Sequence, residues 1–126
     1  MDVPAVLARY PERFDVVMGA DVVHWPTAVL PLVHTIEALL KPGADAVAVI
    51  AYVERGCACW AVQPVLSRFP TLTHAYDSAR TARSFLDALE ASRLRTEFAT
   101  LPVQVDECVL AAGTPRIALI RWKDST

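Results

Sequence analysis

The segment Phe14–Trp25, FDVVMGADVVHW, constrains the fold of this chain more than any other stretch. It opens as a dense apolar run, reaches Gly19, Ala20 and Asp21, and is followed by apolar residues at helical spacing. A run of about ten residues that is apolar on both faces and precedes a helical pattern is typical of a strand in a buried parallel sheet. We therefore predict a strand over residues 14–23.

The small and polar residues near the end of this strand are the candidate functional site. Ligands of open α/β sheets bind in the crevice beyond the carboxyl ends of the strands. Gly19, Ala20, Asp21 and His24 therefore form the predicted lip of a site. The alternative is structural: Asp21 caps the helix that begins near Thr27, and His24 is a partly exposed loop residue.

Length and composition are those of one α/β domain spanning residues 1–126. Hydrophobic residues make up 54% of the 126 positions, which is enough to bury a single core. The formal net charge of -2 gives no reason to expect nucleic acid or an anionic membrane as a partner. No apolar stretch approaches the roughly twenty residues of a membrane-spanning helix, and the N-terminus lacks the basic region of a signal peptide.

Cysteine usage indicates a cytoplasmic protein with free thiols. Cys57, Cys59 and Cys108 are an odd number, which argues against a disulfide framework in a chain with no secretion signal. Their spacing matches no standard zinc finger, so the sequence predicts no metal site.

The rest of the chain alternates between helical and strand-like patterns. Helices are predicted over residues 2–9, 29–40, 60–69 and 79–93, and strands over 14–23, 46–53, 95–103 and 116–122. The first two strands flank a helix, so they should be parallel and joined by a right-handed crossover. The last two are separated only by a turn-bearing connection, so they should form an antiparallel pair.

Four motifs occur in the order FDVVMGADVVHW, ALLKPGADAVAVIAYVER, SFLDALE and RIALIRW. Together they resemble the C-terminal half of a class I S-adenosylmethionine-dependent methyltransferase, from the seven-strand group that methylates protein lysine side chains. The resemblance covers nearly the whole chain from about Phe14 onward. It implies an α/β fold, the C-terminal half of a Rossmann-like sheet, with parallel strands, a terminal antiparallel hairpin and helices on both faces.

The resemblance also implies roles for the residues of the first strand motif. Gly19, Ala20 and Asp21 would contact the cofactor. Asp21 and His24 would be the catalytic residues, with Asp21 orienting the substrate amine. The family has a tyrosine where this chain has His24, so an imidazole replaces a phenol there.

Two further residues are implied at the substrate entrance. Trp25 follows the first strand motif, and Arg55 stands at the arginine-containing end of the next predicted strand. The structural alternatives are that Trp25 is a packing residue and that Arg55 forms a surface ion pair.

The glycine content departs from the family pattern. The chain has only 4 glycines, and no two of them are spaced as a G-x-G turn. The half that carries the glycine-rich cofactor turn is therefore missing, and S-adenosylmethionine would bind only if an N-terminal half were supplied. The sequence therefore does not decide whether this truncated chain is an active enzyme.

Loss of the neighbouring strand would leave residues 14–23 as an exposed apolar edge. Such an edge recruits another strand. We predict pairing with a second copy, giving a homodimer, or with a separately supplied N-terminal half. The partners would be this half and a protein substrate. The alternatives are a catalytically inactive methyltransferase-like interaction module and a gene fragment without an independent role.

Overall fold

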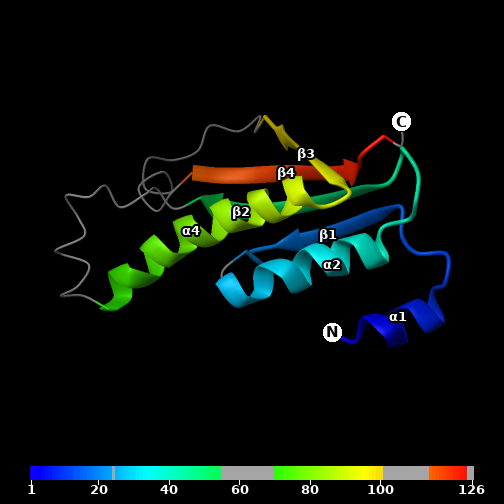
Figure 1. Ribbon diagram of the computed structural model, residues 1–126, viewed down its shortest axis with the longest axis horizontal. Helices are drawn as coiled ribbons and strands as arrows, with labels where there is room; N and C mark the ends of the chain where they lie inside the picture. The colour runs from blue at the N-terminus through cyan, green and yellow to red at the C-terminus, as the bar shows by residue number, and fades with distance from the viewer. Residues whose placement is uncertain (24, 55–69, 101–113, 125–126) are drawn as a thin grey trace.

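The computed structural model describes residues 1–23, 25–54, 70–100 and 114–124, which form an α/β arrangement with one mixed sheet (Figure 1). The sheet contains 4 strands in the order β1-β2-β4-β3. The elements are α1 (Val3–Arg9), β1 (Val16–Ala20), the 3-10 helix η1 (Pro26–Ala28), α2 (Val29–Leu39), β2 (Val47–Glu54), α4 (Pro70–Ala91), β3 (Leu94–Ala99) and β4 (Thr114–Trp122).

Both predicted kinds of strand pairing are present. β1 runs parallel to β2, from Val16 opposite Val47 to Ala20 opposite Ala51. β4 lies between β2 and β3 and is antiparallel to both. β1, β2 and β3 therefore point the same way, so their carboxyl ends meet at one edge of the sheet.

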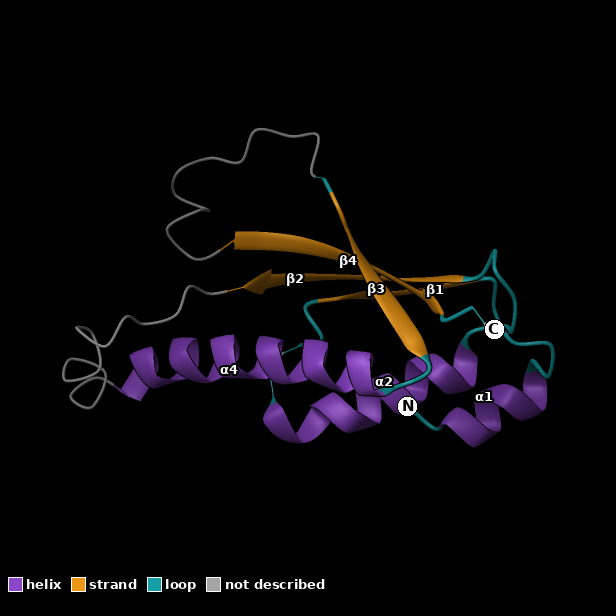
Figure 2. Cartoon of the chain, turned by 45° about the horizontal axis from the view of Figure 1, so that its top comes forward, coloured by secondary structure: helices purple, strands orange, loops and turns teal. Residues whose placement is uncertain are grey.

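The prediction of helices on both faces stays a prediction, because the helix expected over residues 60–69 lies outside the described residues. The described helices lie on one face of the sheet (Figure 2). The reason is the direction of travel across the sheet. The chain passes from β1 to β2 and then beyond β4 to β3, always toward the same side. Crossovers between parallel strands are right-handed almost without exception, so two crossovers in one direction bring α2 and α4 to the same face.

The core lies between this helical layer and the sheet. α2 contributes Val33 and Ile36, and α4 contributes Phe85 and Leu89, all buried. Along β2 the buried residues alternate as Ala48, Ile50 and Tyr52, as expected for a strand with one covered face. The Phe85 ring packs edge-on against Tyr52, with ring centroids 6.1 Å apart, and so joins α4 to the centre of the sheet.

β1 is shorter than the predicted strand 14–23. Asp21 has a φ of 58°, in the left-handed region, which ends the extended backbone directly after Ala20. Val23 then turns into the core, where it is buried. The predicted strand was too long, because the apolar segment 16–23 first forms a strand and then a turn in which Val23 is buried.

α4 begins earlier than predicted. The prediction placed Pro70 at the end of a helix and began the next helix at Ala79, whereas α4 starts at Pro70. Proline fits the first turn of a helix, because the missing N–H would have no partner there, and no glycine or proline follows until after Ala91. The predicted helix over 60–69 lies outside the described residues.

The ends of the two C-terminal strands also differ from the predicted ends. β3 spans Leu94–Ala99 and so begins one residue before the predicted strand 95–103, whose last three residues lie outside the described part of the chain. β4 begins at Thr114, two residues before the predicted start.

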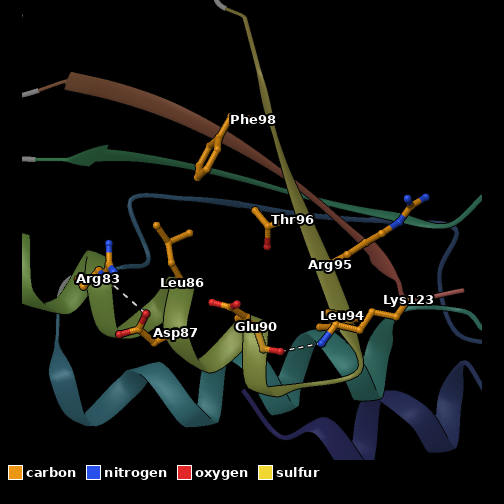
Figure 3. A pocket seen from close by; sticks show the side chains of 9 residues that line it. All are labelled: Arg83, Leu86, Asp87, Glu90, Leu94, Arg95, Thr96, Phe98 and Lys123. Atoms are coloured by element: carbon orange, nitrogen blue, oxygen red, sulfur yellow. Dashed lines mark hydrogen bonds and ion pairs between the residues drawn. The ribbon is translucent and has the colours of Figure 1, made fainter.

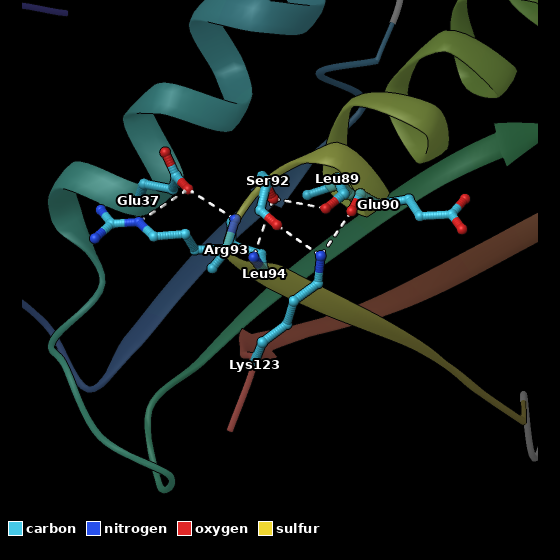
Figure 4. A network of polar contacts seen from close by, with 7 residues as sticks. All are labelled: Glu37, Leu89, Glu90, Ser92, Arg93, Leu94 and Lys123. Carbon is cyan, nitrogen blue, oxygen red and sulfur yellow. Dashed lines mark hydrogen bonds and ion pairs between the residues drawn. The ribbon is translucent and has the colours of Figure 1, made fainter. Parts of the chain in front are cut away.

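A tight polar turn joins α4 to β3 (Figure 4). The Ser92 hydroxyl donates to the Leu89 carbonyl at 2.6 Å and accepts from the Leu94 backbone N–H at 3.0 Å. The Lys123 ammonium donates to the carbonyls of Glu90 and Ser92, both at 2.6 Å. The last carbonyls of α4 are thus bound by groups from the turn and from the end of β4, which fixes β3 against the helix.

Because Phe85 lies in the core, its substitution should destabilise the protein far more than substitution of the partly exposed Phe98. Phe85 is 0% exposed, so Phe85→Ala leaves a cavity and should lower the free energy of unfolding by about 3–5 kcal/mol. Phe98→Ala, at a residue that is 42% exposed, should cost about 1 kcal/mol or less. Urea denaturation followed by circular dichroism measures both. Equal losses in the two variants would contradict this location of the core.

Candidate functional site

The carboxyl end of β1 is formed by a change of backbone direction at Asp21. The Asp21 N–H still donates to the Ala51 carbonyl of β2 at 2.9 Å. The left-handed conformation at Asp21 then turns the chain out of the sheet. Aspartate tolerates this conformation better than most residues, because its short polar side chain bonds locally. The exposed carboxyl group therefore stands at the corner between the sheet edge and the carboxyl ends of the strands.

The structural alternative for Asp21 is contradicted. The helical segment after it consists of η1, whose N-cap is Trp25, and α2, whose N-cap is Ala28. Neither has a side-chain hydrogen bond at its cap, so Asp21 does not cap a helix near Thr27. Trp25 itself is 61% exposed and lies beside this corner in the chain.

Gly19 faces the helical layer and not the open side of the site. A Cβ at Gly19 would lie 3.0 Å from Cδ1 of Ile50 and 3.2 Å from Cγ2 of Val22. Ile50 stands directly opposite Gly19 in the β1–β2 register and is buried. Packing accordingly explains the glycine at this position, while Ala20 is exposed.

The predicted site residues divide into two groups. Gly19, Ala20 and Asp21 are contiguous at the end of β1, with Trp25 after the turn. His24 and Arg55, predicted as a catalytic and a substrate-binding residue, lie outside the described residues. All the cysteines lie outside as well.

The described residues contain neither a metal-binding cluster nor a membrane-spanning helix. Within residues 1–23, 25–54, 70–100 and 114–124, no group of three or more His, Cys, Asp or Glu side chains is arranged to hold a metal ion. In the same part of the chain, no helix combines the length and the apolar character needed to cross a membrane.

A groove of about 400 Å³ lies between α4 and β3, far in sequence from the predicted site (Figure 3). Its charged residues are of both signs, and its lining comprises Arg83, Leu86, Asp87, Glu90, Leu94, Arg95, Thr96, Phe98 and Lys123. Arg83 pairs with Asp87 at 3.5 Å, and Lys123 is held by backbone carbonyls.

One hydroxyl group in this groove stands out. The Thr96 Oγ1 atom is buried and has no hydrogen-bond partner within the described part of the chain. The groove was not predicted from the sequence, although helical spacing on α4 and alternation along β3 place its lining residues on facing surfaces.

Comparison with protein-family models, with curated proteins and with solved structures gave no match to this chain.

The close approach of Gly19 to Ile50 predicts that substitutions at these two residues have non-additive effects on stability. Gly19→Ala should lower the free energy of unfolding by about 1–3 kcal/mol, because the buried Ile50 side chain has no room to move. Ile50→Val removes the Cδ1 atom that the new methyl group would meet. The double variant should therefore be more stable than the sum of the two single losses predicts. Denaturation of all four proteins measures this coupling, and strict additivity would show that Gly19 is not a packing requirement.

Proposed function

We propose that this chain is the C-terminal half of a class I S-adenosylmethionine-dependent methyltransferase that acts on a protein side chain, most simply lysine. The observation that carries the proposal is the sheet: a parallel pair with the Gly19-Ala20-Asp21 corner at its edge, followed by a terminal antiparallel hairpin. This combination is the one that the resemblance of the sequence motifs implies.

The position of β1 supports the same assignment. In doubly wound sheets the ligand binds at the switch point, where the strand order reverses and helices change face. The present sheet is built in one direction from β1, and its described helices cover one face. A sheet that continued past β1 in the opposite direction would have its switch point at β1, beside Asp21.

The residues at this corner fit one wall of a cofactor site. Ala20, Asp21 and Trp25 are exposed there, so backbone and carboxylate groups are accessible to a ligand. Gly19 is turned toward Ile50 and would contribute only through its backbone. The second wall, including a glycine-rich turn, must come from another polypeptide segment.

The reaction requires little acid–base chemistry from the protein. S-adenosylmethionine, when bound, supplies an electrophilic methyl group on a sulfonium. The Asp21 carboxylate would attract the ammonium form of the substrate and orient the amine, while the deprotonated amine is the nucleophile. Positioning and exclusion of water supply most of the rate enhancement in such a transfer. Trp25 would form an apolar side of the entrance.

The alternative is a catalytically inactive methyltransferase-like interaction module. The exposed apolar edge favours it, because Val16 is 54% exposed and Met18 is 78% exposed in β1. Under either proposal the edge would pair with another strand, from a second copy or from a separately supplied half.

Calorimetry with S-adenosylhomocysteine separates the two proposals. The ligand is titrated into the folded chain, alone and mixed with an N-terminal half supplied as a separate polypeptide. The methyltransferase proposal predicts saturable heat in the mixture and roughly a tenfold or greater loss of affinity in Asp21→Ala, because a hydrogen bond to a charged group is lost. Asp45→Ala, an exposed acid in the turn before β2, is the matched control and should bind normally. Absence of heat in every mixture would favour the interaction module.

A further inference from the structure

The hydrogen bonds at the beginning of β3 show which of its backbone groups face outward. The Lys123 N–H donates to the Arg93 carbonyl at 2.9 Å, which continues the β3–β4 register by one residue. Residues with the parity of Arg93 therefore direct their backbone groups toward β4. The Leu94 N–H points the other way, because it donates to the Ser92 hydroxyl at 3.0 Å. Thr96 and Phe98 share the parity of Leu94, so their N–H and carbonyl groups face away from the sheet.

This outer edge of β3 is open and already extended. β3 is the last strand in the order β1-β2-β4-β3. Among the described residues, neither Thr96 nor Phe98 has a backbone partner on the outer side. The turn at Ser92 and the Lys123 ammonium tie the beginning of β3 to α4. The edge is therefore held in place before any strand pairs with it, which lowers the entropic cost of pairing.

The side chains of β3 alternate between two faces of different character. Thr96 and Phe98 point toward α4, whereas Arg95 points away from it (Figure 3). Leu94 lies on the α4 side and is buried. Glu97 shares the other face with Arg95, and their charged groups lie 3.8 Å apart. The face toward α4 is thus apolar apart from one hydroxyl, and the other face carries one charge of each sign.

The strand is complementary to itself when it is read in the opposite direction. A two-fold axis pairs identical strands antiparallel, with one residue opposite itself. With Thr96 on the axis, Arg95 lies opposite Glu97 of the second copy, and Leu94 lies opposite Phe98. Symmetry repeats each contact. The Thr96 N–H of each copy then donates to the Thr96 carbonyl of the other, and the Phe98 N–H donates to the Leu94 carbonyl.

The neighbouring registers bring like charges together. An axis at Arg95 places two guanidinium groups opposite each other, and an axis at Glu97 places two carboxylates there. Like charges directly opposite destabilise a strand pair, whereas opposite charges and threonine pairs stabilise it. The charges of β3 therefore select the register with Thr96 on the axis.

Two side chains on the α4 side gain partners in this register. The Thr96 Oγ1 atom is buried and has no hydrogen-bond partner within the described part of the chain. A second Thr96 directly opposite supplies a hydroxyl on the same face. Phe98 is 42% exposed and would lie beside Leu94 of the other copy. Leu86, Leu94 and Phe98 line the groove of about 400 Å³, so the second copy would add apolar side chains at its open side.

We propose that two copies of this chain pair through their β3 strands, antiparallel and with Thr96 on the two-fold axis, to form one continuous sheet. The two α4 helices then lie on the same face of that sheet. The dimer uses the edge opposite β1, so it leaves the Asp21 corner accessible. It does not depend on methyl transfer and goes beyond the proposed function.

Analytical ultracentrifugation over a range of concentrations tests the dimer. The wild-type chain should dimerise at low ionic strength with a dissociation constant in about the micromolar range. Added salt should raise this constant, because the contacts between Arg95 and Glu97 are exposed and are screened by ions. A wild-type chain that is still monomeric at about 1 mM would overturn the proposal.

Two charge variants test the register. Arg95→Glu places carboxylates opposite each other, and Glu97→Arg places guanidinium groups opposite each other. Each variant alone should dimerise roughly tenfold or more weakly than the wild type. A mixture of the two should form a heterodimer, because each residue 95 then faces the opposite charge at residue 97. Circular dichroism checks that both variants are folded. Single variants that dimerise as tightly as the wild type, or a mixture without heterodimer, would contradict the register.

The matched controls carry the same charge changes away from β3. Arg9→Glu and Glu12→Arg alter exposed residues in and just after α1. Each control should dimerise like the wild type, which would show that position and not net charge decides the effect. Equal weakening in the controls would count against pairing through β3.

Hydrogen exchange followed by NMR locates the interface. As the concentration rises, the Thr96 and Phe98 amides should become protected, and the Val16 and Met18 amides of β1 should not. Protection at β1 without protection at β3 would refute the assignment. None of these readouts involves S-adenosylhomocysteine, so failure here is distinguishable from failure of the methyltransferase proposal.

Discussion

The right-handed connection between parallel strands is the constraint on which the architecture depends. It takes the chain from β1 to β2 through α2, and α4 leads in the same direction to β3. Because travel never reverses, both helices cover one face, where Ile36 and Phe85 complete the core against β2. The same constraint leaves the opposite face without a described helix and leaves β1 at an edge. The apolar residues on the two faces of β1 therefore differ in burial. Val17 packs against the core, and Met18 is exposed on the other face.

The two edges of the sheet are secured differently. β3 is held by the Ser92 turn and by Lys123, whose ammonium group binds two carbonyls near the end of α4. β1 has β2 on one side, and beyond Phe14 it has no described neighbour on the other. Its attachment includes the close packing of Gly19 on Ile50, which requires the absence of a side chain. A strand held on one side, apolar and open on the other, is well suited to pairing, whereas β3 is tied to the body of the protein.

Much of this fold could be predicted from the sequence, because periodicity reports local burial. The continuous apolar run over residues 46–53 and the stripe containing Val33 and Ile36 correctly predicted a strand and a helix, and the short final connection predicted the antiparallel pair. The end of β1 was missed because hydrophobicity does not report backbone handedness, and Asp21 adopts a left-handed conformation inside an apolar run. The groove beside Thr96 joins elements whose packing no local pattern specifies.

Asp21 belongs both to the edge of the sheet at β1 and to the candidate site. Its backbone completes the β1–β2 pairing through Ala51, and its left-handed turn leaves the carboxylate at the corner of the sheet. A strand added beside β1 would therefore pass close to Asp21.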